Sequence, residues 1–329
     1  MGDRDPIPLP RDDSLPGTLA EFVTVYRDET KCAELLRRWK YGPDGFRCPN
    51  CGHHRAWALR TRPVDECQAC GAQTSLTAGT VMHGTRKPLR LWFLALYLFV
   101  SSKQGISALE LQRELGLRSY QTAWSWLHKI RRAVARRPKS RLRGVVEADE
   151  TWEGGLEEGR PGRPRAGEKK ALVVAAVEVD RPRGRWGRAR LDSISSGSAR
   201  SIGAFLNEHV ERASTLLTDA WPSYRRPAEQ LGLRHVPTNV KRCERRAHHV
   251  LPAVHRVFSL LHRVLLTTHQ GAVSIRHLPA YLAEFEFRFN RRRSSSRGLL
   301  FQRVLSAVVR APADPFAEIR GGWSRKRAA

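Results

Sequence analysis

Two pairs of cysteines constrain the fold of this chain more than any other feature. The pairs are Cys48–Cys51 and Cys67–Cys70, separated by fifteen residues, and each is followed by a glycine, Gly52 or Gly71. A glycine at that point permits the positive φ of a tight turn. Four thiolates from two such turns bind one Zn²⁺ tetrahedrally. The pattern predicts a zinc ribbon with a structural metal, because four cysteines leave no open ligand position.

Basic residues dominate the charged composition. The chain has 58 Lys and Arg against 32 Asp and Glu, which gives a formal net charge of +26. A field of that sign attracts polyanions, and nucleic acid is the most abundant of them. An arginine-biased genome is the alternative explanation. Arginines also lie around the cysteine pairs, at Arg47, Arg55, Arg60 and Arg62. They favour DNA as the ligand of the ribbon over protein binding or a purely structural role.

Apolar segments are too short to indicate a membrane protein. The longest apolar run, Leu91–Val100, has ten residues, whereas a membrane span needs ~20. The first residues contain no apolar core typical of a signal peptide. We therefore expect no membrane partner and a cytoplasmic, nucleoid-associated protein.

The N-terminal part reads as helical on either side of the cysteines. Apolar spacing predicts one or two short helices over 18–40 and a buried helix over 88–101. Two further helices, 107–115 and 119–135, are separated by Gly116 and are typical of a helix-turn-helix, although consecutive helices also pack in many other ways. The DNA-contacting residues expected on the second helix are Tyr120, Gln121, Thr122, Arg131 and Arg132.

After a basic linker at 136–143 the pattern changes to short β-rich runs. These runs lie at 145–149, 171–179, 188–194, 215–218 and 234–236. Helical stretches lie at 199–212, 222–231, 251–268 and 276–291. Three strands without an intervening helix, followed by alternating helices and strands, predict a mixed sheet flanked by helices.

An aspartate ends each of two β-runs. Asp149 closes the run from Val145, and Asp219 closes the run from Thr215. Two aspartates on adjacent strands can hold Mg²⁺, a cation that prefers oxygen ligands. In a two-metal site such carboxylates stabilise both oxygens of a phosphoryl transfer. Aspartate is also common at strand ends because it favours turns, so the pair alone leaves both explanations open.

Six short motifs stand out between residues 45 and 292. They are GFRCPNCG (45–52), EADETW (147–152, with Gly154 and Gly155), LTDAW (217–221), SLL (259–261, with Arg263), THQG (268–271) and EFEFRFNRR (284–292). In this order they resemble the bacterial insertion-sequence transposases that combine a zinc ribbon with a DDE-type core, the ISXO-two-like group. The resemblance extends over about residues 18–310.

The resemblance implies a ribonuclease H-like core whose acidic triad holds Mg²⁺ or Mn²⁺. Asp149 and Asp219 take the first two positions. The third falls to His255, where many relatives carry Glu or Asn. Imidazole is a poorer ligand for Mg²⁺ than for Mn²⁺. Three roles are open to His255: it could bind the metal directly, act through a water molecule, or accept a proton from the attacking water or hydroxyl. Glu147 shares a strand face with Asp149 and is expected to support the metal without binding it, while Glu284 is expected to pair with an arginine.

The residue patterns predict a multidomain α/β (α+β) protein with an N-terminal zinc ribbon and helix-turn-helix ahead of a mixed-sheet core, and the resemblance implies that this core is ribonuclease H-like. The expected parts are a disordered N-terminus (1–17), a helical lead-in with the ribbon (18–87), the helix-turn-helix region (88–143), the catalytic core (144–310) and a loose basic tail (311–329).

The implied function is that of a DNA transposase. It would bind the terminal inverted repeats of its element, cleave the strands and join them to target DNA as a homodimer or larger synaptic complex, with Arg291, Arg292 and Arg293 on phosphates. Two alternatives remain. One is a repurposed DNA-binding protein without activity, favoured by the missing third carboxylate. The other is a ribonuclease H-like nuclease that cuts but never joins.

Overall fold

The computed structural model describes residues 15–59, 61–137, 139–154, 170–180, 184–239, 247–271 and 273–322. The parts of the expected disordered N-terminus before residue 15 and of the tail after residue 322 lie outside these ranges, as does most of the loop expected between Gly154 and Lys170. The chain divides into two compact units. The sheet unit is Pro138–Arg293, and the ribbon unit is the chain up to Arg137 together with Ser294–Gly321.

A five-stranded mixed sheet organises the sheet unit. Its strands are β4 (Val145–Gly154), β5 (Lys170–Asp180), β6 (Arg185–Ile194), β7 (Thr215–Asp219) and β8 (Arg234–Thr238). They lie in the order β6-β5-β4-β7-β8, in which β4, β5 and β6 are antiparallel neighbours and β7 and β8 run parallel to β4. This is the strand order of the ribonuclease H-like fold, so the expected fold class is confirmed.

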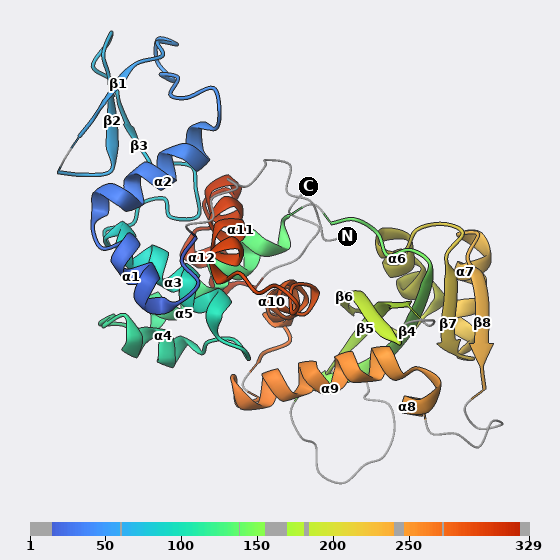
Figure 1. The fold of residues 1–329 in the computed structure, drawn as a ribbon. Helices are drawn as coiled ribbons and strands as arrows, with labels where there is room; N and C mark the ends of the chain where they lie inside the picture. The colour runs from blue at the N-terminus through green and yellow to red at the C-terminus, as the bar shows by residue number, and fades with distance from the viewer. Residues whose placement is uncertain are drawn as a thin grey trace. The chain divides into compact units, whose positions relative to one another are not determined.

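Helices cover both faces of this sheet (Figure 1). They are α6 (Ala199–His209), η1 (Pro222–Tyr224), α7 (Arg225–Gln230), α8 (Ala247–Val250), α9 (Pro252–Thr267) and α10 (Leu278–Asn290). One apolar cluster joins α6 and α7 to one face, and another joins α9 and α10 to the opposite face. Because both faces are covered, β5 is buried continuously from Ala171 to Val177, which explains its uninterrupted apolar sequence.

The ribbon unit combines a small sheet with a helical core. Its elements are α1 (Leu19–Val25), α2 (Glu29–Tyr41), β1 (Ala56–Ala58), β2 (Val64–Cys67), β3 (Gln73–Ser75), α3 (Leu89–Ser101), α4 (Ala108–Glu114), α5 (Tyr120–Ala135), α11 (Arg297–Arg310) and α12 (Phe316–Arg320). Trp92 of α3 stacks on Trp126 of α5 with ring centroids 3.9 Å apart. Within the described ranges, no helix has the length and apolar character needed to cross a membrane.

Helices α4 and α5 form the expected helix-turn-helix. The Ser107 hydroxyl accepts a hydrogen bond from the Glu110 amide (3.1 Å), which caps α4. Gly116 has a φ of 60°, the left-handed conformation that a short interhelical turn requires.

The C-terminal helices α11 and α12 were not predicted. Helix α11 packs against α2, α3 and α5 of the ribbon unit. Its Gln302 accepts a hydrogen bond from the Trp39 indole (2.7 Å). The division into units therefore differs from the expected domain limits, because residues 294–310 pack with the ribbon unit and not with the sheet.

The segment after Ala311 is anchored by a buried carboxylate. Asp314 is only 3% exposed and accepts two hydrogen bonds from Arg136 (2.8 and 2.9 Å). It also lies 3.5 Å from a guanidinium nitrogen of Arg132, which donates to the Glu318 carbonyl (3.0 Å). The expectation of a loose tail is therefore wrong for residues 312–322, because their one buried acid neutralises arginines of α5 and its C-terminus.

Replacing Asp314 by Ala should lower the free energy of unfolding of the ribbon unit by roughly 3–5 kcal/mol, because it leaves buried guanidinium charge without a partner. Urea denaturation of the full chain followed by tryptophan fluorescence measures this. The control is Glu34→Ala, which removes an exposed ion pair with Lys31 (3.4 Å) and should cost about 0.5 kcal/mol or less. Equal effects of the two substitutions would contradict the assignment.

Candidate functional site

The four cysteines of the ribbon converge as the sequence predicted. Their sulfur atoms lie within 4.8 Å of one another, with Cys48–Cys70 at 3.7 Å and Cys51–Cys67 at 3.6 Å. Sulfurs arranged tetrahedrally at the usual Zn–S bond length would be about 3.8 Å apart, so the set fits Zn²⁺.

Backbone geometry shapes each cysteine turn for the metal. Gly52 and Gly71 have φ values of 75° and 69°, which confirms the predicted role of the two glycines. The Ala72 amide and the Asn50 side chain donate to Cys70, and these hydrogen bonds lower the pKa of its thiol. A lowered pKa favours the thiolate, the form that binds zinc.

Asp149 and Asp219 lie level on neighbouring strands. In the parallel pairing of β4 with β7, Glu147 is opposite Leu217. Two residues further along, Asp149 and Asp219 are therefore at the same height and on the same face. Asp149 differs from the sequence expectation in one respect, because β4 continues past it to Gly154.

His255 completes the group from helix α9. Its Nε2 atom lies 3.4 Å from Oδ2 of Asp149. The Asp149 side chain is 13% exposed and that of His255 is 29% exposed, so both are reachable from solvent but largely enclosed. The structure thus brings His255 to Asp149, while Asp219 lies level with Asp149 on the neighbouring strand.

The carboxyl group of Asp149 is electrostatically perturbed. Burial raises its pKa, the Glu150 amide opposes this by donating to Oδ1 (2.8 Å), and the negative charges of Asp219 and Glu150 raise the pKa further, to about 7. Two carboxylates that repel each other, with an imidazole nitrogen beside them, are a donor set that a divalent cation would stabilise.

Glu147, two residues before Asp149 on β4, contacts the backbone of α9. Its Oε2 atom accepts hydrogen bonds from the backbone amides of Ala253 (2.7 Å) and Val254 (3.1 Å) at the start of α9. The carboxylate therefore binds the helix that carries His255.

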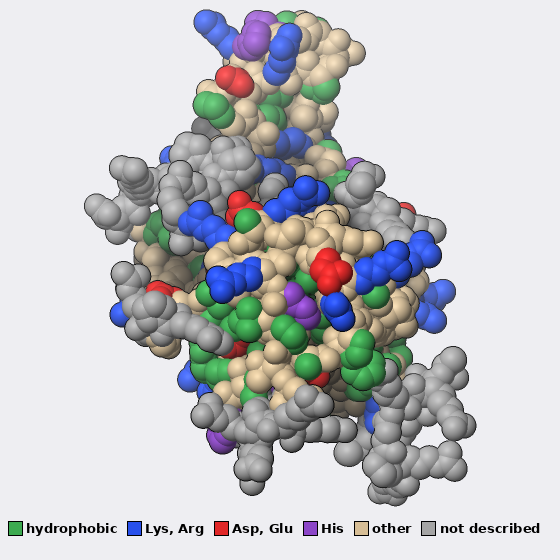
Figure 2. Space-filling view, turned by 90° about the vertical axis from the view of Figure 1, so that its right-hand side faces the viewer, with side chains coloured by type: hydrophobic (Ala, Val, Ile, Leu, Met, Phe, Trp, Pro, Cys, Tyr) green, Lys and Arg blue, Asp and Glu red, His purple; other side chains and the backbone are tan. Residues whose placement is uncertain are grey.

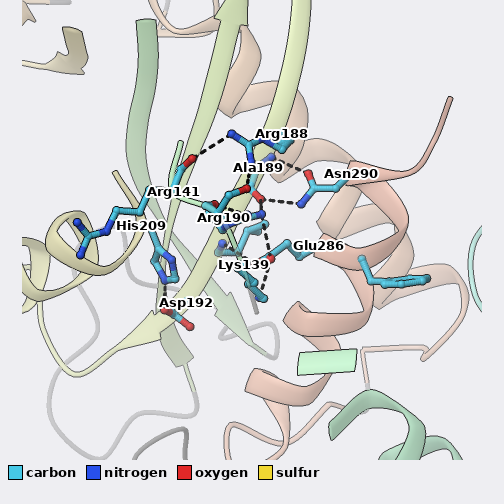
Figure 3. Close-up of polar contacts among 12 residues, drawn as sticks. Lys139, Arg141, Arg188, Ala189, Arg190, Asp192, His209, Glu286 and Asn290 are labelled. Atoms are coloured by element: carbon cyan, nitrogen blue, oxygen red, sulfur yellow. Dashed lines mark hydrogen bonds and ion pairs between the residues drawn. The ribbon is translucent and has the colours of Figure 1, made fainter. Parts of the chain in front are cut away.

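The motif EFEFRFNRR ties α10 to the edge strand β6 (Figure 3). Asn290 accepts from the Ala189 amide (2.7 Å) and donates to the Ala189 carbonyl (3.0 Å). Glu286 lies 2.6 Å from Lys139 Nζ and 3.3 Å from the fully buried Arg190. Glu284 pairs with Arg288 (2.9 Å), as expected. These contacts explain the motif, because they hold α10 against β6 and so cover the edge strand of the sheet.

A second group of possible metal ligands lies elsewhere in the sheet unit. Asp192, Glu208 and His209 bring ligand atoms within 4.8 Å of one another, and His209 Nε2 lies 2.8 Å from Asp192. Asp192 alternates with Leu191 on β6, so the group faces α6, on the opposite side of the sheet from Asp149 and His255. Nothing in the sequence pattern linked these residues.

Residues expected to contact DNA differ in their exposure. Tyr120 is 52% exposed, Gln121 is exposed and Thr122 is half-buried at the start of α5. Arg131 and Arg132 are buried (1% and 3% exposed), so their assignment to DNA contact is corrected. Both lie on the inner side of an amphipathic helix, where Arg132 neutralises Asp314.

The three arginines after α10 also differ from one another. Arg291 lies over the Phe287 ring at 4.3 Å and donates to the Phe287 carbonyl. Arg292 donates to the carbonyls of Gly187 and Trp186. Arg293 is exposed. Of the three, Arg293 is therefore the best placed for a phosphate contact.

Two segments of the chain match known transposase families. Residues 141–290 match the ISXO2-like transposase domain, and residues 27–73 match the transposase zinc-ribbon domain. A relative, an uncharacterized protein in transposable element ISH50 of Halobacterium salinarum, is 26% identical over 216 residues, which cover 61% of this chain and 71% of that protein.

Solved structures give weaker similarities. A chain in the Mos1 strand transfer complex is 16% identical with a TM-score of 0.30 over 66% of this chain and 74% of that chain. A chain in a simian T-cell lymphotropic virus intasome is 11% identical with a TM-score of 0.28 over 60% of this chain and 65% of that chain. Scores this low do not establish a common fold, so the fold assignment rests on the strand order of the sheet.

Proposed function

Because residues 141–290 match the ISXO2-like transposase domain and residues 27–73 match the transposase zinc-ribbon domain, we propose that this chain cleaves DNA at the ends of its own insertion sequence and joins those ends to target DNA. The observation that carries the proposal is the contact of His255 Nε2 with Asp149 (3.4 Å), beside Asp219 on the neighbouring strand. We propose that these three residues hold the catalytic divalent metal, as Mg²⁺ or Mn²⁺.

Each of the three residues has a defined part. Asp149 and Asp219 supply anionic oxygens from the two neighbouring strands β4 and β7, and His255 adds a nitrogen donor from α9. A bound divalent cation would activate the attacking oxygen and neutralise charge on the phosphodiester. Since imidazole binds Mn²⁺ better than Mg²⁺, we expect higher activity in Mn²⁺.

DNA recognition is assigned to the ribbon unit. The exposed first turn of α5, with Tyr120 and Gln121, would enter the major groove as the second helix of a helix-turn-helix does. The net charge of +26 supports a polyanionic partner. Figure 2 shows basic side chains spread over the face in view, with few acidic ones between them. Because two ends must be paired before joining, we propose a homodimer or larger synaptic complex.

The test is a cleavage and strand-transfer assay on DNA that carries the repeats flanking the element, in Mg²⁺ and in Mn²⁺. Cleaved ends together with joined products, both absent for Asp219→Asn, are expected. Specific binding without products in either metal would favour a repurposed DNA-binding protein. Cleavage without joining would favour a nuclease. Either result would overturn the proposal.

Replacing Arg293 by Ala should reduce the slope of log K for DNA binding against log salt by about one, because one phosphate contact and its released counterion are lost. Binding titrations over a range of salt concentrations measure the slope. The matched control is Arg225→Ala, an exposed arginine already paired with Glu229 (3.2 Å), and its slope should equal that of the unmodified chain. An unchanged slope for the Arg293 variant would show that Arg293 does not contact a DNA phosphate.

A further inference from the structure

Helix α9 begins without a cap of its own. Its N-cap residue is Leu251, which has no side-chain hydrogen-bonding group, and Pro252 opens the first turn. The amides of Ala253 and Val254 would therefore lack partners inside the helix. Glu147 of β4, more than a hundred residues earlier in the chain, accepts from both amides at 2.7 and 3.1 Å.

The capping carboxylate is buried. Glu147 is 1% exposed, and the desolvation of a charged carboxylate is costly unless hydrogen bonds compensate it. Two backbone amides and the positive end of the helix dipole provide that compensation. Such a cap holds the first turn of α9 at a defined height along β4.

The same turn carries His255. Glu147 and Asp149 lie two residues apart on one face of β4, so one contacts the backbone of the turn while the other contacts its imidazole. We propose that Glu147 is a positioning residue that holds His255 against Asp149. The inference rests on the proposed role of Asp149 and His255. Glu147 itself is assigned no contact with metal or DNA.

The chain contains a matched control. In the ribbon unit, Glu29 caps α3 in the same way, accepting from the amides of Leu89 (2.7 Å) and Arg90 (3.0 Å). Pro88 precedes that helix and supplies no side-chain cap. Helix α3 carries no candidate site residue, so removing the Glu29 carboxylate reproduces the loss of a cap without touching the site.

The first test observes the His255 side chain directly in the full chain, with its zinc in place but without added Mg²⁺, Mn²⁺ or DNA. Imidazole nitrogen chemical shifts are recorded by NMR, the His255 signal is assigned by its loss in His255→Gln, and Asp149→Asn defines the position of that signal when the contact is lost. Glu147→Ala should move the His255 signal toward the Asp149→Asn position. Glu29→Ala should leave the signal in place.

The second test reads the reaction. Glu147→Ala should lower kcat for strand cleavage by about 10–100-fold with KM for DNA unchanged, the range seen when a residue that orients a ligand is removed. Glu147→Gln should recover most of the activity, because its amide oxygen still accepts from the two backbone amides. Glu29→Ala should retain activity even if its melting temperature falls.

The proposal is overturned if Glu147→Ala folds and leaves the His255 signal unmoved. If Glu147→Ala does not fold, Glu147→Asp replaces it, because the shorter side chain withdraws the carboxylate by one methylene. An unmoved His255 signal in a folded Glu147→Asp variant overturns the proposal equally. Because the NMR test needs no Mg²⁺, Mn²⁺, DNA or turnover, its outcome is separate from the failure of the proposed transposition activity.

Discussion

Replacing Asp149 by Asn should reduce both strand cleavage and strand transfer by about 10³-fold or more. The substitution keeps the size of the side chain but removes the negative charge and one strong oxygen ligand from the site. A metal site supplies several kcal/mol of charge stabilisation in the transition state, and each ~1.4 kcal/mol corresponds to a factor of ten in rate. The measurement is the rate of product formation in Mn²⁺ on DNA that carries the element's ends.

The control for this substitution comes from the same sheet. Asp192 also lies on a strand of this sheet, β6, and also contacts a histidine, His209 at 2.8 Å, but it faces the other side of the sheet. Asp192→Asn should therefore retain activity. If Asp192→Asn were inactive while Asp149→Asn kept its rate, the catalytic metal would have to be reassigned to the group of Asp192, Glu208 and His209.

Local patterns in the sequence predicted most of the fold. The cysteine spacing predicted the ribbon, because both halves of the zinc site are short turns within one segment. Short β-rich runs predicted all five strands of the mixed sheet, and β5 was the clearest of them because a strand buried on both faces has a continuous apolar sequence. Helix α11 was missed, because it follows a run of arginines and serines and is stabilised by contacts with α2, α3 and α5 that are distant in sequence.

The candidate site was predictable only in part. The two aspartates followed from their places on neighbouring β-runs, and His255 followed from the resemblance to a family. The cap that Glu147 provides for α9 joins residues more than a hundred positions apart. The spacing of apolar residues along the sequence predicts local helices and strands but not a contact between such distant residues. For Arg131 and Arg132 the sequence led to a wrong prediction of DNA contact. A sequence does not distinguish a buried arginine that neutralises an acid from an exposed arginine that binds phosphate.

Replacing Cys67 by Ser should remove zinc and unfold the ribbon. Cys67 is fully buried and ends β2, the central strand of a sheet whose strands have three or four residues. A sheet that small buries little apolar surface, so its stability depends on the metal, and structural zinc contributes about 10–16 kcal/mol in zinc-finger peptides. Zinc content measured by atomic absorption should fall from one ion per chain to less than a tenth, and binding to the element's ends should be lost.

The control for the zinc prediction is Cys32→Ser. Cys32 is also fully buried, but it lies in α2 and its thiol faces the Tyr26 carbonyl (3.9 Å), away from the four clustered sulfurs. That variant should keep one zinc ion and bind the element's ends. If Cys67→Ser kept both its zinc and its DNA binding, the ribbon would not depend on a four-cysteine site. If it lost zinc but kept full DNA binding, recognition would lie with α4 and α5 alone, since these helices fold around the Trp92–Trp126 core without using the metal.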